Sequence, residues 1–306
     1  MTRFVVRRLL HGLLVAVLVT ITVFFATRVL TDPAKLLLPI GSSEEQRDAL
    51  RTSMGLNDPL AEQFATFLGD VVRFDFGESA WQHLPARELV FERLPATFTL
   101  VGAGMLAAVA LFVPLGVVAA VRPGRWPDRL VSIVSLGGLS LPQFWVGAML
   151  IWLFAVRLGW LPTSGRGGWQ HLVLPAFTLA LTSGGRVALT TRNAMVEQLR
   201  APYVEAARAK GLPERTILVR HVLRNALVPV VTLSMWEVAN NVAGAAVVVE
   251  TVFAWPGIGQ LLINAVRFND VFLLQAIVFI TALQIVATNF VTDLLYKIAD
   301  PRLEIA

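Results

Sequence analysis

The sequence predicts an all-α polytopic membrane protein, and three features of its composition support this fold class. Of the 306 residues, 56% are hydrophobic and only 15% are charged, whereas soluble domains carry about 25% charged residues. The apolar residues form blocks of about 20 or more, the length of helix that crosses a hydrocarbon core of about 30 Å. They do not alternate with polar residues in short segments, as strands of a membrane barrel do. The absence of cysteine also excludes disulfide and thiol chemistry.

Six apolar segments are predicted to span the membrane: residues 9–30, 94–121, 130–156, 172–185, 226–249 and 272–296. The first follows three arginines, as the core of a signal peptide does. Its apolar run is too long for that and no small-residue cleavage site follows, so we expect a retained helix. The fourth segment is the shortest, because Arg186 interrupts its apolar run.

The lysines and arginines of the short loops predict the orientation of these spans. Arginines gather before the first span, in the loop VRPGRWPDR after the second, and in the segment after the fourth. The segments after the third and fifth spans carry few. We therefore expect both termini in the cytoplasm. This distribution accounts for the net charge of +5 without a nucleic acid partner.

Residues 31–93 are then predicted to lie outside the cytoplasm, and they are rich in Asp and Glu. Two stretches within them, EEQRDALRTSMGL and PLAEQFATFLGDVVRF, place apolar residues at helical spacing. We expect these stretches to form a small external helical insert rather than an extended linker.

Motifs of catalysis are missing from the sequence. The four histidines lie far apart, without the spacing of a metal site. No G-x-x-x-x-G-K-[ST] motif is present, so any work driven by ATP requires a partner. The stretch GAGMLA at 102–107 formally fits a dinucleotide pattern. It lies inside an apolar span, however, where small residues let helices approach closely.

A basic segment follows the fourth span, and its residue order predicts two helices joined by a tight turn. Tyr203, Ala206, Ala207 and Lys210 recur at the spacing of one helical face. Gly211 is suited to end that helix, and Pro213 to begin the next. Two alanines beside Glu205 form a thin ridge that could dock into a groove of another protein. The alternative is a solvated loop whose arginines only set the topology.

The stretch EAARAKG resembles the E-A-A-x-x-x-G coupling loop of permease subunits in binding-protein-dependent ABC importers. Further stretches, in order along the chain, are similar to the peptide and nickel branch of that family: GLNDPLAEQF, FDFGES, ERLPATFTL, LSLPQFWVG, RHVLRNALVPVV, VVVETVFAWPGIGQLL and TDLLYKIADPRL. The chain most resembles the first permease of a dipeptide-type system. The resemblance assigns contact with an ATPase to the loop at about 197–225, through Tyr203, Glu205, Ala206, Ala207, Lys210, Gly211 and Leu212.

The resemblance implies a type I ABC importer permease fold, with a first helix and insert at 1–93 and a permease domain at 94–306. It also implies a second permease subunit, two ATP-binding subunits or halves, and an extracytoplasmic solute-binding protein. ATP and Mg would be held by the ATPase partners and no cofactor by this chain. The expected function is ATP-driven import of di- or oligopeptides across the bacterial cytoplasmic membrane by alternating access. Nickel complexes or another small solute are the alternative cargo.

Polar residues within the fifth span are candidates for the translocation pathway. Glu237, Asn240 and Asn241 lie in the stretch WEVANN, and charged groups at such depth usually face a bundle interior or an aqueous path. They could equally form hydrogen bonds with a partner subunit. A third interpretation makes Glu237 the proton site of a secondary transporter. Near the fourth span, Arg186, Arg192 and Asn193 are candidates for an inner gate or for topology and interface residues.

Overall fold

The computed structural model describes residues 2–29, 38, 42–53 and 55–299, and this part of the chain is helical without a β-sheet. The end of the predicted first span at residue 30, most of 31–41 and the C-terminal 300–306 lie outside the described residues. The chain divides into two compact units. One combines residues 1–95 with Gly257–Phe290, and the other consists of Ala96–Pro256 with the segment from Val291.

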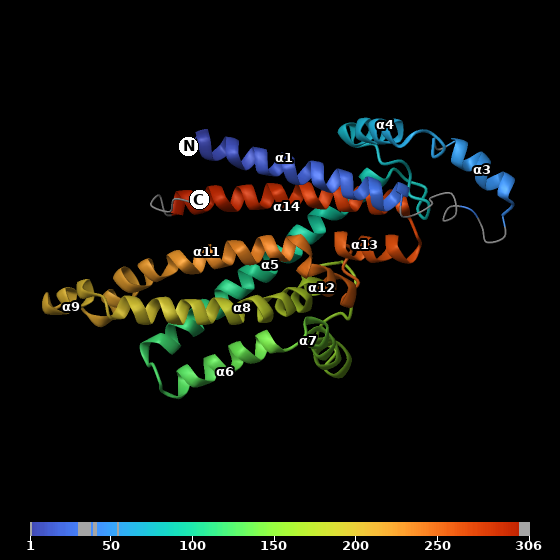
Figure 1. The fold of residues 1–306 in the computed structure, drawn as a ribbon. Helices are drawn as coiled ribbons and strands as arrows, with labels where there is room; N and C mark the ends of the chain where they lie inside the picture. The colour runs from blue at the N-terminus through green and yellow to red at the C-terminus, as the bar shows by residue number, and fades with distance from the viewer. Residues whose placement is uncertain (1, 30–37, 39–41, 54, 300–306) are drawn as a thin grey trace. The chain divides into compact units, whose positions relative to one another are not determined.

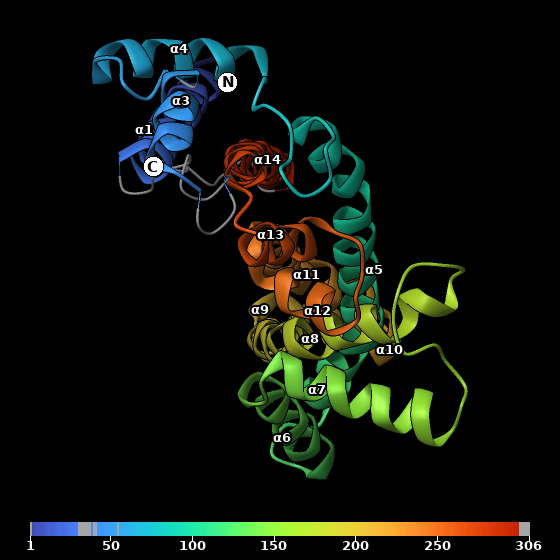
Figure 2. The same ribbon diagram turned by 90° about the vertical axis from the view of Figure 1, so that its right-hand side faces the viewer.

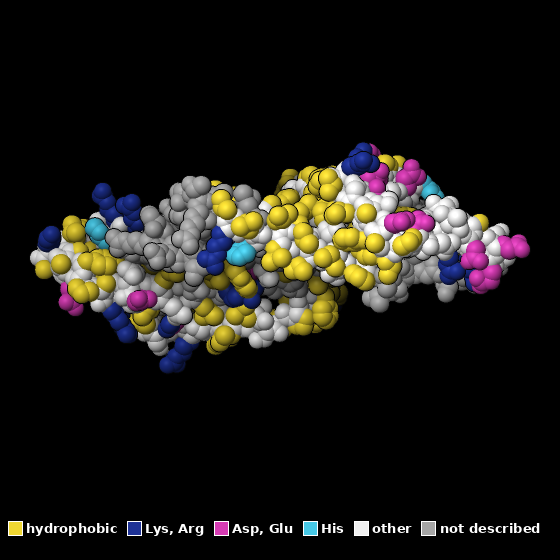
Figure 3. Space-filling model, turned by 45° about the horizontal axis from the view of Figure 1, so that its top comes forward, with side chains coloured by type: hydrophobic (Ala, Val, Ile, Leu, Met, Phe, Trp, Pro, Cys, Tyr) yellow, Lys and Arg dark blue, Asp and Glu magenta, His cyan; other side chains and the backbone are white. Residues whose placement is uncertain are grey.

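The first unit contains α1 (Thr2–Phe24), α3 (Glu44–Ser53), α4 (Leu60–Arg73), α13 (Ile258–Arg267) and most of α14 (Val271–Ala299) (Figure 1). The helices α3 and α4 confirm the helical character that the two amphipathic stretches predict. Aromatic side chains join α4 to α1, where the Phe24 and Phe64 rings lie 5.1 Å apart at 78°. Figure 3 shows acidic side chains gathered over α3.

Asp270 connects the loop after α4 to the start of α14 within the first unit. Its side chain is fully buried and accepts hydrogen bonds from the Ser79 hydroxyl (2.5 Å), the Trp81 backbone N–H (3.2 Å) and the Leu273 backbone N–H (3.0 Å). The last of these satisfies a donor in the first turn of α14 that has no partner within the helix.

The second unit is built around α8 (Gln170–Leu199). It also contains the rest of α5 (Ala86–Val121), α6 (Trp126–Ser140), α7 (Gln143–Leu150), α9 (Pro202–Ala209), α10 (Glu214–Thr216), α11 (Arg224–Asn240) and α12 (Ala246–Val252). Helix α8 lies between α11 on one side and α6 and α7 on the other (Figure 2). π-Helical segments extend α7 through Ile151–Arg157, join α10 to α11 through Ile217–Leu223 and join α11 to α12 through Asn241–Ala245.

Small residues bring α8 close to α5 and α6. A Cβ atom added to Gly104, within the GAGMLA stretch, would lie 2.8 Å from the Cβ of Leu179 on α8. At Gly185 it would lie 2.6 Å from the carbonyl oxygen of Ser135 on α6. Both distances are shorter than real contacts, so these positions exclude a side chain. Gly104 of GAGMLA therefore lies at a helix contact, and the stretch is part of α5 and lacks the strand that a dinucleotide site requires.

The membrane spans differ from the sequence prediction in two places. Among the described residues, five helices are long and apolar enough to cross a bilayer, and the sixth candidate is the bent pair of Trp126–Ser140 with Gln143–Arg157. The predicted span at 130–156 is therefore not one continuous helix, because the pair bends by 106°. The break occurs at Leu141, which is extended (φ −83°, ψ 132°), since a residue that precedes proline disfavours helical geometry.

The fourth span is the second difference. Arg186 does not interrupt the helix, which continues from Gln170 to Leu199. The arginine is tolerated inside α8 because the neighbouring helix supplies a carboxylate, Glu237, that forms an ion pair with it.

Candidate functional site

Helix α9 is a short helix that presents one exposed face and one buried face. Val204 is fully buried and Ala207 is 8% exposed, and both pack with Ile217, Val222 and Met195. Tyr203, Glu205, Ala206 and Lys210 are exposed. The expectation that Ala207 shares the exposed face is wrong for this chain. The two buried residues, three positions apart, form the stripe that attaches an eight-residue helix to the core.

The turn after α9 has the geometry that the sequence predicts. Gly211 adopts φ +74°, a conformation that residues with a Cβ rarely adopt. The Gly211 N–H donates to the Arg208 carbonyl (2.9 Å), and the Leu212 N–H donates to the Ala207 carbonyl (3.3 Å). These two bonds form a Schellman motif that closes the helix. Pro213 then directly precedes α10.

Side-chain bonds hold α9 in place from both sides. The Tyr203 hydroxyl donates to Gln198 (2.8 Å) and accepts from the Asn225 amide (3.3 Å). Arg208 donates through Nε to Glu214 (2.7 Å), and this hydrogen bond raises the pKa of the Arg208 guanidinium above its usual range. A groove of about 250 Å³ lies beside this pair and is also lined by Val121, Leu199 and other residues of α5 and α8.

A bidentate ion pair ties the end of α8 to the start of α6. Arg192 donates through Nε and Nη2 to the two oxygens of Asp128, at 2.7 and 2.8 Å. Asp128 also accepts the Gly124 N–H at 2.8 Å. The structure therefore gives Arg192 a helix-joining contact. Sequence reasoning missed Asp128, although it is the only acid within the arginine-rich loop VRPGRWPDR.

The predicted pathway residues separate in the structure. Glu237 is fully buried, and both its oxygens accept hydrogen bonds from Arg186, through Nε and through Nη2 (2.9 Å). Asn241 is also buried and donates to Ser183 (3.2 Å) and to the Glu237 carbonyl (2.8 Å). Asn240 is exposed. Their role in the pathway stays a prediction.

A second buried carboxylate in the same unit was not singled out by the sequence. Glu250 of α12 is fully buried and accepts a hydrogen bond from the Thr97 hydroxyl at 2.6 Å. Nearby, the Trp255 indole N–H donates to the Ala96 carbonyl at 2.9 Å. One bond attaches α12 to α5, and the other attaches the FAWPG stretch that follows α12 to α5. Both contacts lie where α5 enters the second unit.

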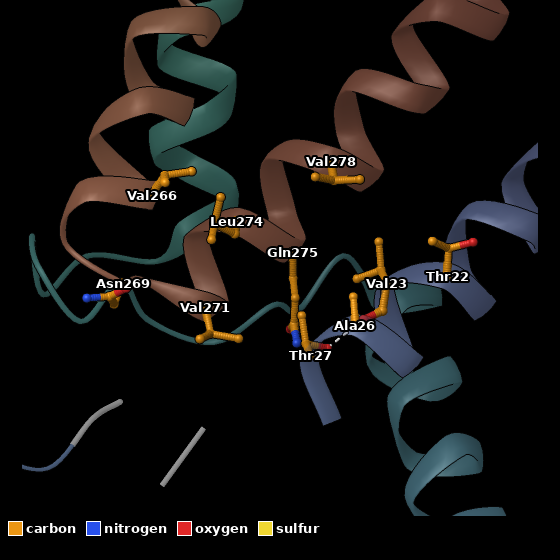
Figure 4. A pocket seen from close by; sticks show the side chains of 10 residues that line it. All are labelled: Thr22, Val23, Ala26, Thr27, Val266, Asn269, Val271, Leu274, Gln275 and Val278. Atoms are coloured by element: carbon orange, nitrogen blue, oxygen red, sulfur yellow. Dashed lines mark hydrogen bonds between the residues drawn. The ribbon is translucent and has the colours of Figure 1, made fainter. Parts of the chain in front are cut away.

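A cavity of about 420 Å³ lies within the first unit, between the end of α1 and the start of α14 (Figure 4). Val23 and Thr27 line one wall, and Val271 and Leu274 the other. Gln275 reaches from α14 toward Thr27 (Figure 4). Among the described residues, those that line it include no ionisable group.

The spans and the docked helix α9 define a class: a helical membrane subunit that presents a short surface helix between two spans. Comparison with known sequences specifies it further. The chain belongs to the inner membrane components of binding-protein-dependent transport systems, because the profile of that family matches residues 112–305 and that of its N-terminal region matches residues 1–101. It is therefore a permease subunit of an ABC importer in the peptide and nickel branch, and not itself an enzyme.

Similar proteins support this assignment along the whole chain. The glutathione transport system permease protein GsiC of Escherichia coli K12 is 36% identical over 302 residues, which cover 98% of each chain. The protein of the same name from Shigella dysenteriae serotype 1 matches equally. Among solved structures, an inward-facing MetNI methionine ABC transporter superposes with a TM-score of 0.59 at 18% identity, over 69% of this chain and 96% of that one. This likeness confirms the importer permease fold.

Proposed function

We propose that this permease subunit imports short peptides. The observation that carries the proposal is the 36% identity to a glutathione permease over 98% of both chains. Glutathione is a tripeptide with free carboxylates, so the similarity supports a small, charged, peptide-like substrate. Nickel complexes or another small solute remain the second candidate, because the branch as a whole carries them.

The exposed face of α9 is proposed to contact an ATPase partner. It presents Tyr203, Glu205, Ala206 and Lys210 on a helix whose other face is anchored in the core. Because α9 is anchored on one side and its turn at Gly211 is fixed, a displacement of α9 would also displace α8 and α11. A flexible loop at this place would deform instead. The contact must favour one ATPase state over the other, because equal affinity for both shifts no equilibrium.

The proposed assembly contains this chain, a second permease subunit, two ATP-binding subunits or halves and an extracytoplasmic solute-binding protein. ATP and Mg would bind to the ATPase partners. The substrate would pass from the binding protein into a path between the two permease subunits by alternating access.

We expect cells that carry this chain and its partners to take up labelled glutathione or dialanine, and cells without this chain to lose that uptake. ATP depletion should stop uptake, whereas collapse of the proton gradient at constant ATP should not. Uptake of nickel alone would contradict the peptide assignment. Uptake that survives ATP depletion and stops with the proton gradient would favour secondary transport through Glu237 instead.

The proposed topology places both termini in the cytoplasm and helices α3 and α4 outside. The arginines near α9 and in the α5–α6 loop support it. Because the chain has no cysteine, single substitutions report position directly. Glu45→Cys should react with an impermeant maleimide added outside spheroplasts, and Arg125→Cys only after permeabilisation. The opposite labelling pattern would reverse the topology.

A further inference from the structure

Three side chains form an exposed polar patch on the second unit, where α8 and α11 pack together. We call Arg186, Trp236 and Asn240 the α8–α11 patch. The Arg186 side chain is 40% exposed and Trp236 is 50% exposed, and Asn240 is exposed one helical turn further. Arg186 lies six residues, about 9 Å, along α8 from Arg192, whose partner Asp128 lies in the first turn of α6, directly after the α5–α6 loop, so in the proposed topology the patch lies in the cytoplasmic half of the span.

The guanidinium of Arg186 is held on one edge and on one face. The Arg186 Nε and Nη2 atoms donate hydrogen bonds to Glu237. The Arg186 Cζ atom lies 5.7 Å from the centre of the Trp236 ring. Within the described part of the chain, neither Nη1 of Arg186 nor the Asn240 side chain forms a hydrogen bond. The patch therefore combines oriented but unused donors with a flat aromatic surface.

Lipid chains cannot satisfy these groups. A cation within a membrane span is costly unless it faces water or another polar group. The burial of Glu237 on the protein side leaves the other side of Arg186 for a ligand or for water. Arginine is suited to this task, because its planar donors match the two oxygens of a carboxylate.

Glu237 determines the orientation of the Arg186 guanidinium and also how tightly that group can hold an anion. It is enclosed by the chain, so it reaches a solute only through Arg186. Because the negative charge of Glu237 offsets the positive charge of the guanidinium, Arg186 binds an anion less tightly than an unpaired arginine would. A transport site requires such balance, because the solute must bind and also leave.

We propose that Arg186 binds the negatively charged group of the transported solute during translocation, with Glu237 as its positioning residue. Asn240 and the Trp236 ring would contact the remainder of that solute. The identification of the charged group as a peptide carboxylate rests on the proposed function, whereas the anion site itself does not.

The test uses Asn240→Cys in the complete transporter reconstituted in proteoliposomes, and the probes are two small thiol reagents of opposite charge. We expect both the anionic methanethiosulfonate ethylsulfonate and its cationic trimethylammonium analogue to modify the cysteine. In the background Arg186→Gln/Glu237→Gln, the ratio of anionic to cationic rates should fall, because the positive charge that is lost is exposed at the patch whereas the negative charge lost with it is enclosed. The double variant keeps a hydrogen-bonding side chain at both positions. It therefore removes both charges without leaving a buried carboxylate that has no partner. Leu106→Cys, at an apolar position of α5 that is 74% exposed, is the control and should stay unreactive.

Two results would overturn the proposal. A cysteine at 240 that neither reagent modifies means that the second permease subunit or lipid covers the patch. An unchanged rate ratio in the double variant means that Arg186 attracts no anion. If the ratio falls but the wild-type transporter imports no peptide, the anion site stands and the proposed substrate class is wrong. If peptides are imported, the double variant should raise KM for labelled glutathione or dialanine at least fivefold.

Discussion

Replacing Arg186 with leucine will destabilise the chain by about 3–5 kcal/mol, because it leaves a buried carboxylate without its partner. Glu237 has no exposed surface and accepts both of its hydrogen bonds from Arg186. Glu237→Gln should cost much less, since the amide keeps the size and an acceptor and Arg186 is 40% exposed. Denaturant unfolding of the purified complex in mild detergent, with its yield from membranes, measures both variants.

The matched control for this prediction is Arg186→Leu/Glu237→Leu. Apolar replacement of both members of a buried ion pair is often neutral, so the double variant should recover most of the stability that Arg186→Leu loses. It should not recover transport, if the anion site is correct. A single Arg186→Leu variant as stable as the wild type would show that the ion pair does not hold α8 against α11.

Replacing Gly211 with valine will abolish uptake while leaving the ATPase subunits able to hydrolyse ATP. A β-branched residue at φ +74° is strained by about 1–3 kcal/mol, and relief of this strain would break the two Schellman bonds at the end of α9. The exposed face of the helix would then shift relative to its partner. Uptake of labelled substrate and ATP hydrolysis, measured together in proteoliposomes, give the coupling ratio.

Gly159→Val is the matched control, because Gly159 has φ +65° and open space around it, but lies in the loop after α7. It should carry similar backbone strain and retain coupling. Glu205→Lys should also lower the coupling ratio, since it reverses an exposed charge on α9 and disturbs no buried contact. Normal uptake by an assembled Gly211→Val transporter would show that the turn at Gly211 has no role in coupling.

The sequence predicted well those elements whose structure depends on residues close together in the chain. Helices α3 and α4 follow from amphipathic spacing, and the turn at Gly211 follows from the one residue type that adopts its backbone angle freely. The break at Leu141 had a local signal too, in the proline that follows it, but the apolar run around it favoured a single helix.

The ion pairs had no local signal. Arg186 and Glu237 are 51 positions apart, and Arg192 and Asp128 are 64 apart. Each residue was visible as a charge in or near an apolar span. Which opposite charge faces it depends on the rotation of two helices about their axes, and hydropathy does not specify that rotation.

From its sequence alone, this protein is predicted to be a helical membrane protein without a phosphate-binding loop of its own, because span length, loop charge and such a motif are properties of contiguous residues. Only the tertiary structure decided that α8 continues through Arg186, that Ala207 is buried while Ala206 is exposed, and that Glu237 is enclosed. The physical reason is the same in each case. The energy of a polar or small side chain in a membrane helix is set by the neighbouring helix that it contacts, and that neighbour comes from a distant part of the chain.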